Sequence, residues 1–411
     1  MINPKTPART ALIRLLYGAQ ASGFRRESLR RRARDEEDPI KRILVVRPDH
    51  LGDLLFATAA LDRIRKAFPG AHITGLVGPW GKAMWQGNPS LNALQVLPFP
   101  GISAARTRAL SPYLMINKSA WKLFQRRYDL GIVLRFDHWW GAALLWAAGI
   151  PQRWGYSTPG MDTWLTGSVP YSPGRHEVEQ NLTLVEAMLG SVAGPSRLQR
   201  IGTPEVDRGQ GVPSLRPPRG EPLQPELARA WLLSPRHAVI HPGTAAANKL
   251  WTIDGWAEVA RRLTSEGWSV ALTGSPEEQK LAGAIEAQVG SGAPLVNLAG
   301  KTANLGQLVW VLGQADLVLG VDSGPLHIAD ALGKRTLHLY GPSDEQIWGP
   351  WGDLHRHRAL RAPGTAPTMH LDVGSTALEG GPEMKAITPD MVMSEVKSLL
   401  ADVRSSAVGS T

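Results

Sequence analysis

Three separate stretches of the chain carry residue types that could take part in a group-transfer reaction. The first is the turn PDHLGD, in which Asp53 follows the apolar run RILVVR and opens a segment with an apolar helical stripe. A carboxylate at the start of a helix is favoured by the helix dipole, and it can act as a general base. Asp53 also suits a helix-capping role, so both interpretations stay open. His50 in the same turn is a second acid–base candidate.

The second stretch covers residues 320–341 and reads GVDSGPLHIADALGKRTLHLYG. Residues 317–321 form an apolar run typical of a buried strand, and the Asp-Ser-Gly turn at 322–324 precedes a proline that suits the first turn of a helix. Gly333 ends the predicted helix, and residues 335–340 form the next strand. A helix that begins directly after a strand offers free amides and a positive dipole end to an anion such as phosphate.

The third stretch, residues 241–251, reads HPGTAAANKLW and is expected to follow another strand. Its small residues would let a ligand approach the backbone, and Lys249 could place a positive charge on a phosphate oxygen. The spacing is not that of a Walker loop, and by itself the pattern fits a plain surface loop equally well.

Composition limits the classes of function. The 411 residues include no cysteine, which excludes disulfides, thiolate metal sites and cysteine nucleophiles. The formal charge of +9 points to an anionic partner. Basic residues are not interleaved with aromatics in any motif typical of nucleic-acid binding, so we expect no nucleic-acid partner. No apolar run of about 18 residues is present, and we expect a cytoplasmic protein.

Strand and helix patterns alternate along most of the chain, which predicts α/β domains with parallel sheets covered by helices. We expect a basic extension at 1–40, a first domain at 41–193 and a linker rich in proline, glycine and arginine at 194–235. A second domain at 236–385 and a final helix and tail at 386–411 would follow. Two such domains would place a ligand cleft between the carboxyl ends of their strands.

The extension combines an apolar helical pattern with a dense arginine cluster and a short acidic patch at 35–38. Such a segment could lie on an anionic membrane surface. It could equally be a solvated leader, and the sequence leaves both interpretations open.

Three histidines near the C-terminus, His355, His357 and His370, match no metal-site spacing. We therefore expect them to be scattered surface residues. The fifteen tryptophans are expected mostly in the core or lining a cleft.

Together these motifs resemble glycosyltransferase family 9, the heptosyltransferases of lipopolysaccharide core synthesis. The resemblance rests on RILVVRPDHLGDLLFATAALDRIRKAFPGAHI, on HEVEQNLTLVEAMLG, on HPGTAAANKLW and, most specifically, on GVDSGPLHIADALGKRTLHLYGPSDEQIWGP. These stretches occur in the family's order over about residues 41–400, and the extension lies outside them.

The resemblance implies GT-B architecture, with two Rossmann-like domains facing a central cleft, and an inverting, metal-independent transfer. The donor would be a nucleotide-sugar such as ADP-heptose, and the acceptor a lipid-linked or other cell-envelope glycan. Asp53 matches the family's general base. The matches to donor contacts are Thr244, Lys249, Asp322, Ser323, Gly324, Leu326 and His327, with Gly324 and Leu326 supplying amides because Pro325 has none. No metal or other cofactor is expected.

Two departures from the family pattern concern the acceptor and a cysteine cluster. Val133 and Arg135 stand where many members have Asp and Gln, so the acceptor side could differ. Residues 362–384 lack the cysteines that many members carry there. Two further functions share the architecture: a nucleotide-sugar epimerase, which would turn over donor alone, and a non-catalytic binding protein, which would turn over nothing.

Overall fold

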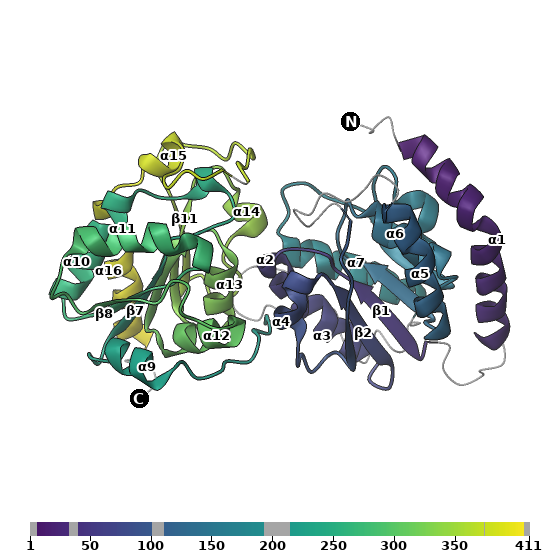
Figure 1. The fold of residues 1–411 in the computed structure, drawn as a ribbon, viewed down its shortest axis with the longest axis horizontal. Coiled ribbons are helices and arrows are strands. Elements are labelled where there is room, and N and C mark those ends of the chain that lie inside the picture. The colour runs from purple at the N-terminus through teal and green to yellow at the C-terminus, as the bar shows by residue number, and fades with distance from the viewer. Residues whose placement is uncertain (1–5, 33–39, 101–110, 193–213, 374, 407–411) are drawn as a thin grey trace. The chain divides into compact units, whose positions relative to one another are not determined.

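The computed structural model describes residues 6–32, 40–100, 111–192, 214–373 and 375–406. The chain divides into two compact units, Met1–Pro204 and Glu205–Thr411. Each unit contains its own six-stranded parallel sheet with helices on its faces (Figure 1). The α/β class and the two parallel sheets predicted from the alternating patterns are confirmed.

The first sheet has the strand order β3-β2-β1-β4-β5-β6. β1 lies in its interior, and its last four residues are fully buried because strands flank it and helices cover it. The strands of this sheet are β1 (Arg42–Val46), β2 (His72–Val77), β3 (Ala93–Val96), β4 (Leu130–Val133), β5 (Gln152–Ser157) and β6 (Gly167–Pro170).

Two groups of helices pack within the first unit: α3 against α7, and α1 with α5 and α6. The segment with an apolar helical stripe that Asp53 was expected to open is divided between two helices, which meet at Ala57. The Thr58 hydroxyl donates to the Leu55 carbonyl oxygen at this junction, a local bond of the kind that bends helices. The helices are α1 (Thr6–Arg32), α2 (Leu51–Phe56), α3 (Thr58–Ala67), α4 (Lys82–Trp85), α5 (Ser111–Gln125), α6 (Trp139–Ala147) and α7 (Glu177–Val192).

The basic extension contributes α1, which packs on α5 and α6 (Figure 1). Ile13, Tyr17 and Ala21 are buried on its inner face, and the Tyr17 hydroxyl donates to the Tyr113 carbonyl oxygen at 2.7 Å. Residues 6–32 are thus a packed helix, and the solvated-leader interpretation is wrong for them. Arg34 and the acidic patch lie outside the described residues, and the side chains of Arg31 and Arg32 lie outside the described ones.

The second sheet has the strand order β12-β11-β10-β7-β8-β9. Its central strand β10 is buried along its whole length and coincides with the apolar run predicted at 317–321. The strands are β7 (His237–His241), β8 (Ser269–Leu272), β9 (Leu295–Asn297), β10 (Leu317–Val321), β11 (Arg335–Tyr340) and β12 (His357–Arg361).

Helix α10 packs with α11 and with α16 in the second unit, while α12 packs with α13. Several begin as their sequences predict: Thr252 caps α10, and the Thr388 hydroxyl accepts a hydrogen bond from Met391 in the first turn of α16. The helices are α9 (Pro225–Trp231), α10 (Ile253–Ser265), α11 (Gln279–Val289), α12 (Leu305–Gln314), α13 (Gly324–Ala331), α14 (Glu345–Trp348), α15 (Pro382–Lys385) and α16 (Pro389–Ser406).

The stretch assigned to a linker, 194–235, is only partly described. Residues 193–213 lie outside the described residues, and α9 forms within the remainder. Trp231 at the end of α9 is fully buried in the second unit. Among the described residues, no helix is long and apolar enough to cross a membrane.

Both sheets have the same topology when their strands are numbered along each half: 3-2-1-4-5-6. The winding direction reverses between β1 and β4 in the first sheet and between β7 and β10 in the second. In open parallel sheets, ligands bind beyond the carboxyl ends of the strands at such a reversal. The residues that follow these four strands are therefore where each unit should carry its site.

Candidate active site

In the first unit, a buried arginine gathers several carboxylates beyond the end of β1. Arg47 Nη2 lies 3.1 Å from Asp49, 3.0 Å from Glu177 and 3.5 Å from Asp53. Its Nη1 donates to Asn181 and to the carbonyl oxygen of Leu134, at the end of β4. Arg47 is 2% exposed, and its charge makes it possible to bury these acids together.

Asp53 is the least compensated acid of this group. Burial raises the pKa of Asp53 well above its usual value, and the negative charges of Asp49 and Glu177 raise it further, although Arg47 lowers it. Burial would also raise the pKa of Asp49, but Arg47 and Arg135 lower it overall. Two neighbouring carboxyls whose pKa values are pushed apart are the arrangement expected where one of them exchanges a proton with a ligand.

The surrounding side chains fix this acid group in place. Arg135, which stands where many family members have Gln, binds Asp49 at 2.7 Å. Tyr171 donates to Glu177 at 3.0 Å. His50, the second acid–base candidate, is exposed at the start of α2. The contacts of Arg47 with Glu177 and Asn181 on α7 were not predicted, because 130 or more residues separate them in the sequence.

In the second unit, the structure brings together four of the predicted donor contacts. Lys249 Nζ lies 2.7 Å from Asp322 Oδ2, and the Thr244 hydroxyl donates to the Asp322 carbonyl oxygen at 3.3 Å. His327 Nε2 lies 3.3 Å from Asp322 Oδ1. Although burial alone would raise the pKa of Asp322, Lys249 and His327 hold it well below its usual range. Asp322 is therefore ionised and holds the lysine at the end of β10.

At the start of α13, one of the predicted donor-binding groups lacks a hydrogen-bond partner among the described residues and another already has one. Gly324 is the first helical residue, and Ser323 precedes it in an extended conformation. The Ser323 hydroxyl is buried and has no hydrogen-bond partner among the described residues. The Leu326 amide, expected to face a diphosphate, donates to the Ser323 carbonyl oxygen at 3.2 Å.

The residues at the end of β7 serve packing as well as binding. His241 is buried and its Nδ1 lies 3.0 Å from the Thr273 hydroxyl. A Cβ at Gly243 would lie 2.0 Å from the Glu278 carboxylate, so a larger residue there would have to displace that side chain. Glu278 in turn accepts a hydrogen bond from the Ser275 amide.

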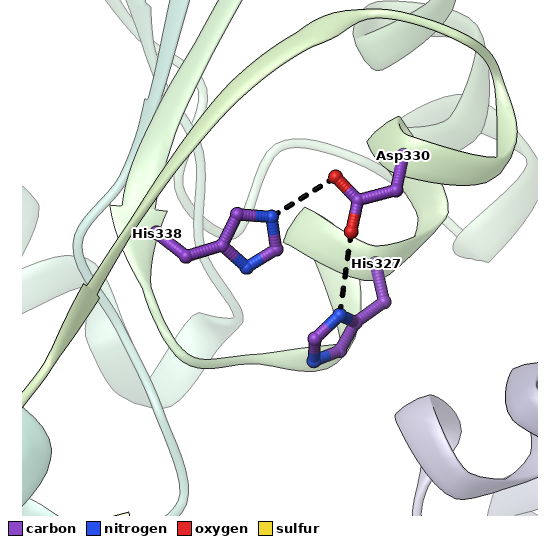
Figure 2. A group of neighbouring side chains, drawn as sticks. All are labelled: His327, Asp330 and His338. Atoms are coloured by element: carbon purple, nitrogen blue, oxygen red, sulfur yellow. Dashed lines mark hydrogen bonds and ion pairs between the residues drawn. The ribbon is translucent and has the colours of Figure 1, made fainter. Parts of the chain in front are cut away.

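Behind the Lys249–Asp322 pair lies a buried cluster of histidines and one acid (Figure 2). Asp330 on α13 contacts His327 at 3.5 Å, and its other oxygen lies 3.0 Å from His338 on β11. That second oxygen also accepts from Thr336 at 2.5 Å and lies 3.4 Å from His357. Atoms of His327, Asp330 and His338 lie within 4.8 Å of one another, but the hydrogen bonds to Asp330 favour a polar network over a metal centre.

The expectation of scattered surface histidines is wrong for His357, which is 4% exposed. It opens β12, a strand that the sequence patterns did not reveal, and pairing with β11 directs it toward Asp330. His355 and His370 are exposed as expected. Tryptophans are largely in the core as predicted, and the fully buried ones are Trp85, Trp140, Trp164, Trp231, Trp251, Trp256 and Trp268.

A family model described as glycosyltransferase family 9 (heptosyltransferase) matches residues 116–371. The chain is 29% identical to lipopolysaccharide heptosyltransferase 3 of Escherichia coli over 310 residues, which are 74% of this chain and 84% of that protein. It is 26% identical to lipopolysaccharide heptosyltransferase 2 of Salmonella typhimurium over 381 residues, 88% of this chain and 99% of that one.

Two solved structures share the fold. The glycosyl transferase family 9 protein of Veillonella parvula has a TM-score of 0.70 at 22% identity, covering 90% of this chain and 99% of its own. The ADP-heptose lipopolysaccharide heptosyltransferase II of E. coli has a TM-score of 0.67 at 23% identity, covering 88% and 99%. Since the family model also spans more than half of the sequence, the chain belongs to glycosyltransferase family 9, the heptosyltransferases, and is a glycosyltransferase.

Proposed function

We propose that the chain is an inverting, metal-independent transferase that moves heptose from ADP-heptose to a lipopolysaccharide-type acceptor. The names of its relatives support the sugar and the acceptor class. The observation that carries the proposal is Asp53, a carboxyl with a raised pKa that remains 19% exposed beyond the end of β1.

On the acceptor side, Asp53 takes the proton from the attacking hydroxyl as the new glycosidic bond forms. Arg47 helps to lower the pKa of Asp49, and the negative charges of Asp49 and Glu177 oppose the effect of Arg47 on Asp53, so that the pKa of Asp53 stays raised. A base with a raised pKa accepts a proton more readily than an ordinary carboxylate, which helps with a weakly acidic hydroxyl.

On the donor side, Lys249 contacts the diphosphate and stabilises the charge that develops as it departs. Asp322 orients Lys249, and we assign it a second contact with a sugar hydroxyl. Thr244, the Ser323 hydroxyl and the Gly324 amide complete the proposed donor contacts, with His327 behind Asp322. The Leu326 amide, the other amide expected to face the diphosphate, is instead hydrogen-bonded to the Ser323 carbonyl oxygen. The lysine and the helix start supply positive potential without a metal ion.

The test of the base is Asp53→Asn, assayed for transfer of radiolabelled heptose. We expect the turnover number to fall by about 10²- to 10⁴-fold, the usual contribution of a general base. Calorimetric binding of ADP should be unchanged, because the donor residues lie in the second unit.

The control is Asp62→Asn, which removes a carboxylate of α3 that pairs with Lys66 on the helix surface. It should transfer heptose at the wild-type rate. Full activity of Asp53→Asn would rule out Asp53 as the base, and product with the donor's anomeric configuration would contradict inversion. Loss of activity in a chelator such as EDTA would contradict metal independence.

We further propose that the enzyme works at the cytoplasmic face of a membrane and that α1 contacts the anionic lipid surface there. While Ile13 and Tyr17 face inward, Leu15 is 83% exposed and Leu16 is 52% exposed on the outer face. One turn earlier, Leu12 is also exposed, so the three leucines form one apolar stripe.

Basic residues continue the same outer face toward the end of α1. Arg26 and Arg30 are exposed at helical spacing, and Leu29 lies beside them. Exposed leucines flanked by arginines are the composition expected of a helix lying at a lipid headgroup boundary. The charge complements anionic lipids, each basic residue near the surface contributing about 1 kcal/mol.

A further inference from the structure

The polar cluster behind the donor site forms a continuous line of alternating charge. Lys249 binds Asp322, Asp322 contacts His327, and His327 contacts Asp330, at 2.7, 3.3 and 3.5 Å in turn. Figure 2 shows the far end of the line, where Asp330 lies between the rings of His327 and His338. The contacts join the loop after β7, the helix α13 and the strand β11.

These side chains are buried where an apolar core would be the default. Asp330 is 4% exposed and His338 is completely buried in the middle of β11, with apolar neighbours on that strand. Burying ionised groups costs several kcal/mol, and replacing them with apolar residues is often neutral or stabilising. Stability alone therefore does not account for a carboxylate at position 330.

The neighbours of Asp330 fix the direction in which it acts. Thr336 and His338 both contact Oδ1, and His357 lies on the same side. The other oxygen, Oδ2, is left facing His327 Nδ1. Asp330 therefore presents one defined oxygen to the histidine, and the histidine presents Nε2 to Asp322.

We propose that Asp330, held by Thr336 and His338, is a positioning residue for the nucleotide-sugar site, acting through His327 on the Asp322–Lys249 pair. The inference rests on the proposed function, because it assumes that Lys249 binds the donor diphosphate. With a carboxylate on each side, both nitrogens of His327 carry protons, and the imidazolium offsets the charge of Asp322. Lys249 then keeps more of its own charge for the diphosphate.

The charge state of His327 agrees with this geometry. Burial would lower the pKa of His327, but its contacts with Asp322 and Asp330 raise it to about 9. The charged and titratable groups around it are Asp322, Asp330, His338, Lys249 beyond Asp322 and His357 beyond Asp330. The cationic form of His327 persists at neutral pH and is lost as the pH rises through about 9, and the imidazolium then no longer offsets the charge of Asp322.

The test measures ADP binding by calorimetry from pH 6 to pH 10 on the full chain and on Asp330→Asn. Wild-type affinity should weaken as the pH rises through about 9. In Asp330→Asn the neutral amide no longer stabilises the imidazolium, so the transition should move down by at least about one pH unit. Since the protonated fraction of His327 falls tenfold per pH unit above its pKa, a shift of one unit should lower the affinity about twofold at pH 8 and about tenfold at pH 10, while affinity at pH 6 stays near that of the wild type.

The matched control is Asp316→Asn, which removes a carboxylate beside His237 at the other end of β10. Its binding curve should follow the wild type. An unchanged transition in Asp330→Asn, or an equal loss of affinity at every pH, would overturn the proposal and leave Asp330 a structural residue only. A stoichiometric metal ion in the purified protein would also overturn it, because the ion would take over the oxygens of Asp330.

A second measurement needs no variant. Histidine ring resonances of the wild-type protein should include one ring that stays doubly protonated up to pH 8, and titration of every ring below pH 7.5 would contradict the inference.

The variant Lys249→Ala distinguishes a failure of the proposed donor site from a failure of the positioning role of Asp330. Unchanged ADP affinity in Lys249→Ala would refute the donor site itself. If Lys249→Ala loses affinity but the binding transition of Asp330→Asn stays at the wild-type pH, only the positioning role is refuted.

Discussion

At the scale of single residues, the acceptor side depends on how unevenly charge is shared around Arg47. One guanidinium contacts three carboxylates, and Arg135 adds a second positive charge beside Asp49. Burial raises the pKa of Asp53, and repulsion from the negative charges of Asp49 and Glu177 raises it further, against the attraction of Arg47. The basicity of the site is a property of the group rather than of Asp53 alone.

Removing the charge of Asp49 should make this visible in the pH profile. The proposed role of Asp53 as the base requires its ionised form, so we expect activity to fall as the pH drops through the raised pKa of that group. In Asp49→Asn a negative neighbour is lost and Arg47 pairs more fully with Asp53, so the pKa of Asp53 falls. The acid limb of kcat should therefore move to lower pH, by about one unit for each 1.4 kcal/mol of lost repulsion.

The pH dependence of steady-state heptose transfer provides the measurement, with Asp62→Asn as the variant that should keep the wild-type limb. An acid limb that stays in place, or moves to higher pH, would show that Asp49 does not set the basicity of Asp53.

At the scale of elements, α1 is an addition to the first unit with two different faces. Phe24 stacks on Phe124 of α5 at a centroid distance of 3.8 Å, and Arg14 donates to Thr163 at 2.6 Å. Deleting the helix would expose the apolar surfaces of α5 and α6. A deletion would therefore change the stability of the unit as well as its binding to a membrane, and the two effects could not be separated. Point changes on the outer face are the cleaner test.

We expect the double variant Leu15→Glu with Leu16→Glu to bind phosphatidylglycerol vesicles at least tenfold more weakly than the wild type. Each buried leucine contributes about 1.5–3 kcal/mol, and the new carboxylates repel an anionic surface. Co-sedimentation with vesicles measures the effect. Leu233→Glu, at a side chain that is 71% exposed in the second unit, should bind as the wild type does. Equal binding by the double variant would remove α1 as the contact.

At the scale of the whole molecule, the two units repeat one topology with different chemistry at the reversal point. Acidic groups follow β1, whereas a lysine, a paired aspartate and a helix start follow β7 and β10. Each unit also has its own apolar core, so each can respond to its ligand separately.

Hydrogen–deuterium exchange with saturating ADP should therefore slow exchange in residues 241–251 and 320–341. Ligand bound only to the native state stabilises by about 2.7 kcal/mol at a hundred times its Kd, which is enough to suppress local opening. Protection should be absent from residues 42–56, which carry the predicted base. Protection confined to residues 42–56 would reverse the assignment of donor and acceptor sides.

The sequence by itself determined the class of fold and the positions of the reactive loops. Strand and helix periods mark β1, β7, β10 and α13 within a residue or two, because buried parallel strands are short apolar runs and helix starts are local signals. β5, β6 and β12 escaped prediction because none of them is a continuous apolar run, and α5 because it lies in a basic stretch.

Only the tertiary structure decided which distant residues meet. Glu177 reaches Arg47, and His338 and His357 reach Asp330, because the order and register of parallel strands bring together segments that are separate in the chain. No local pattern encodes these contacts. The raised pKa of Asp53 and the charged state of His327 follow from them, since both depend on burial beside several charges that only the folded sheet assembles.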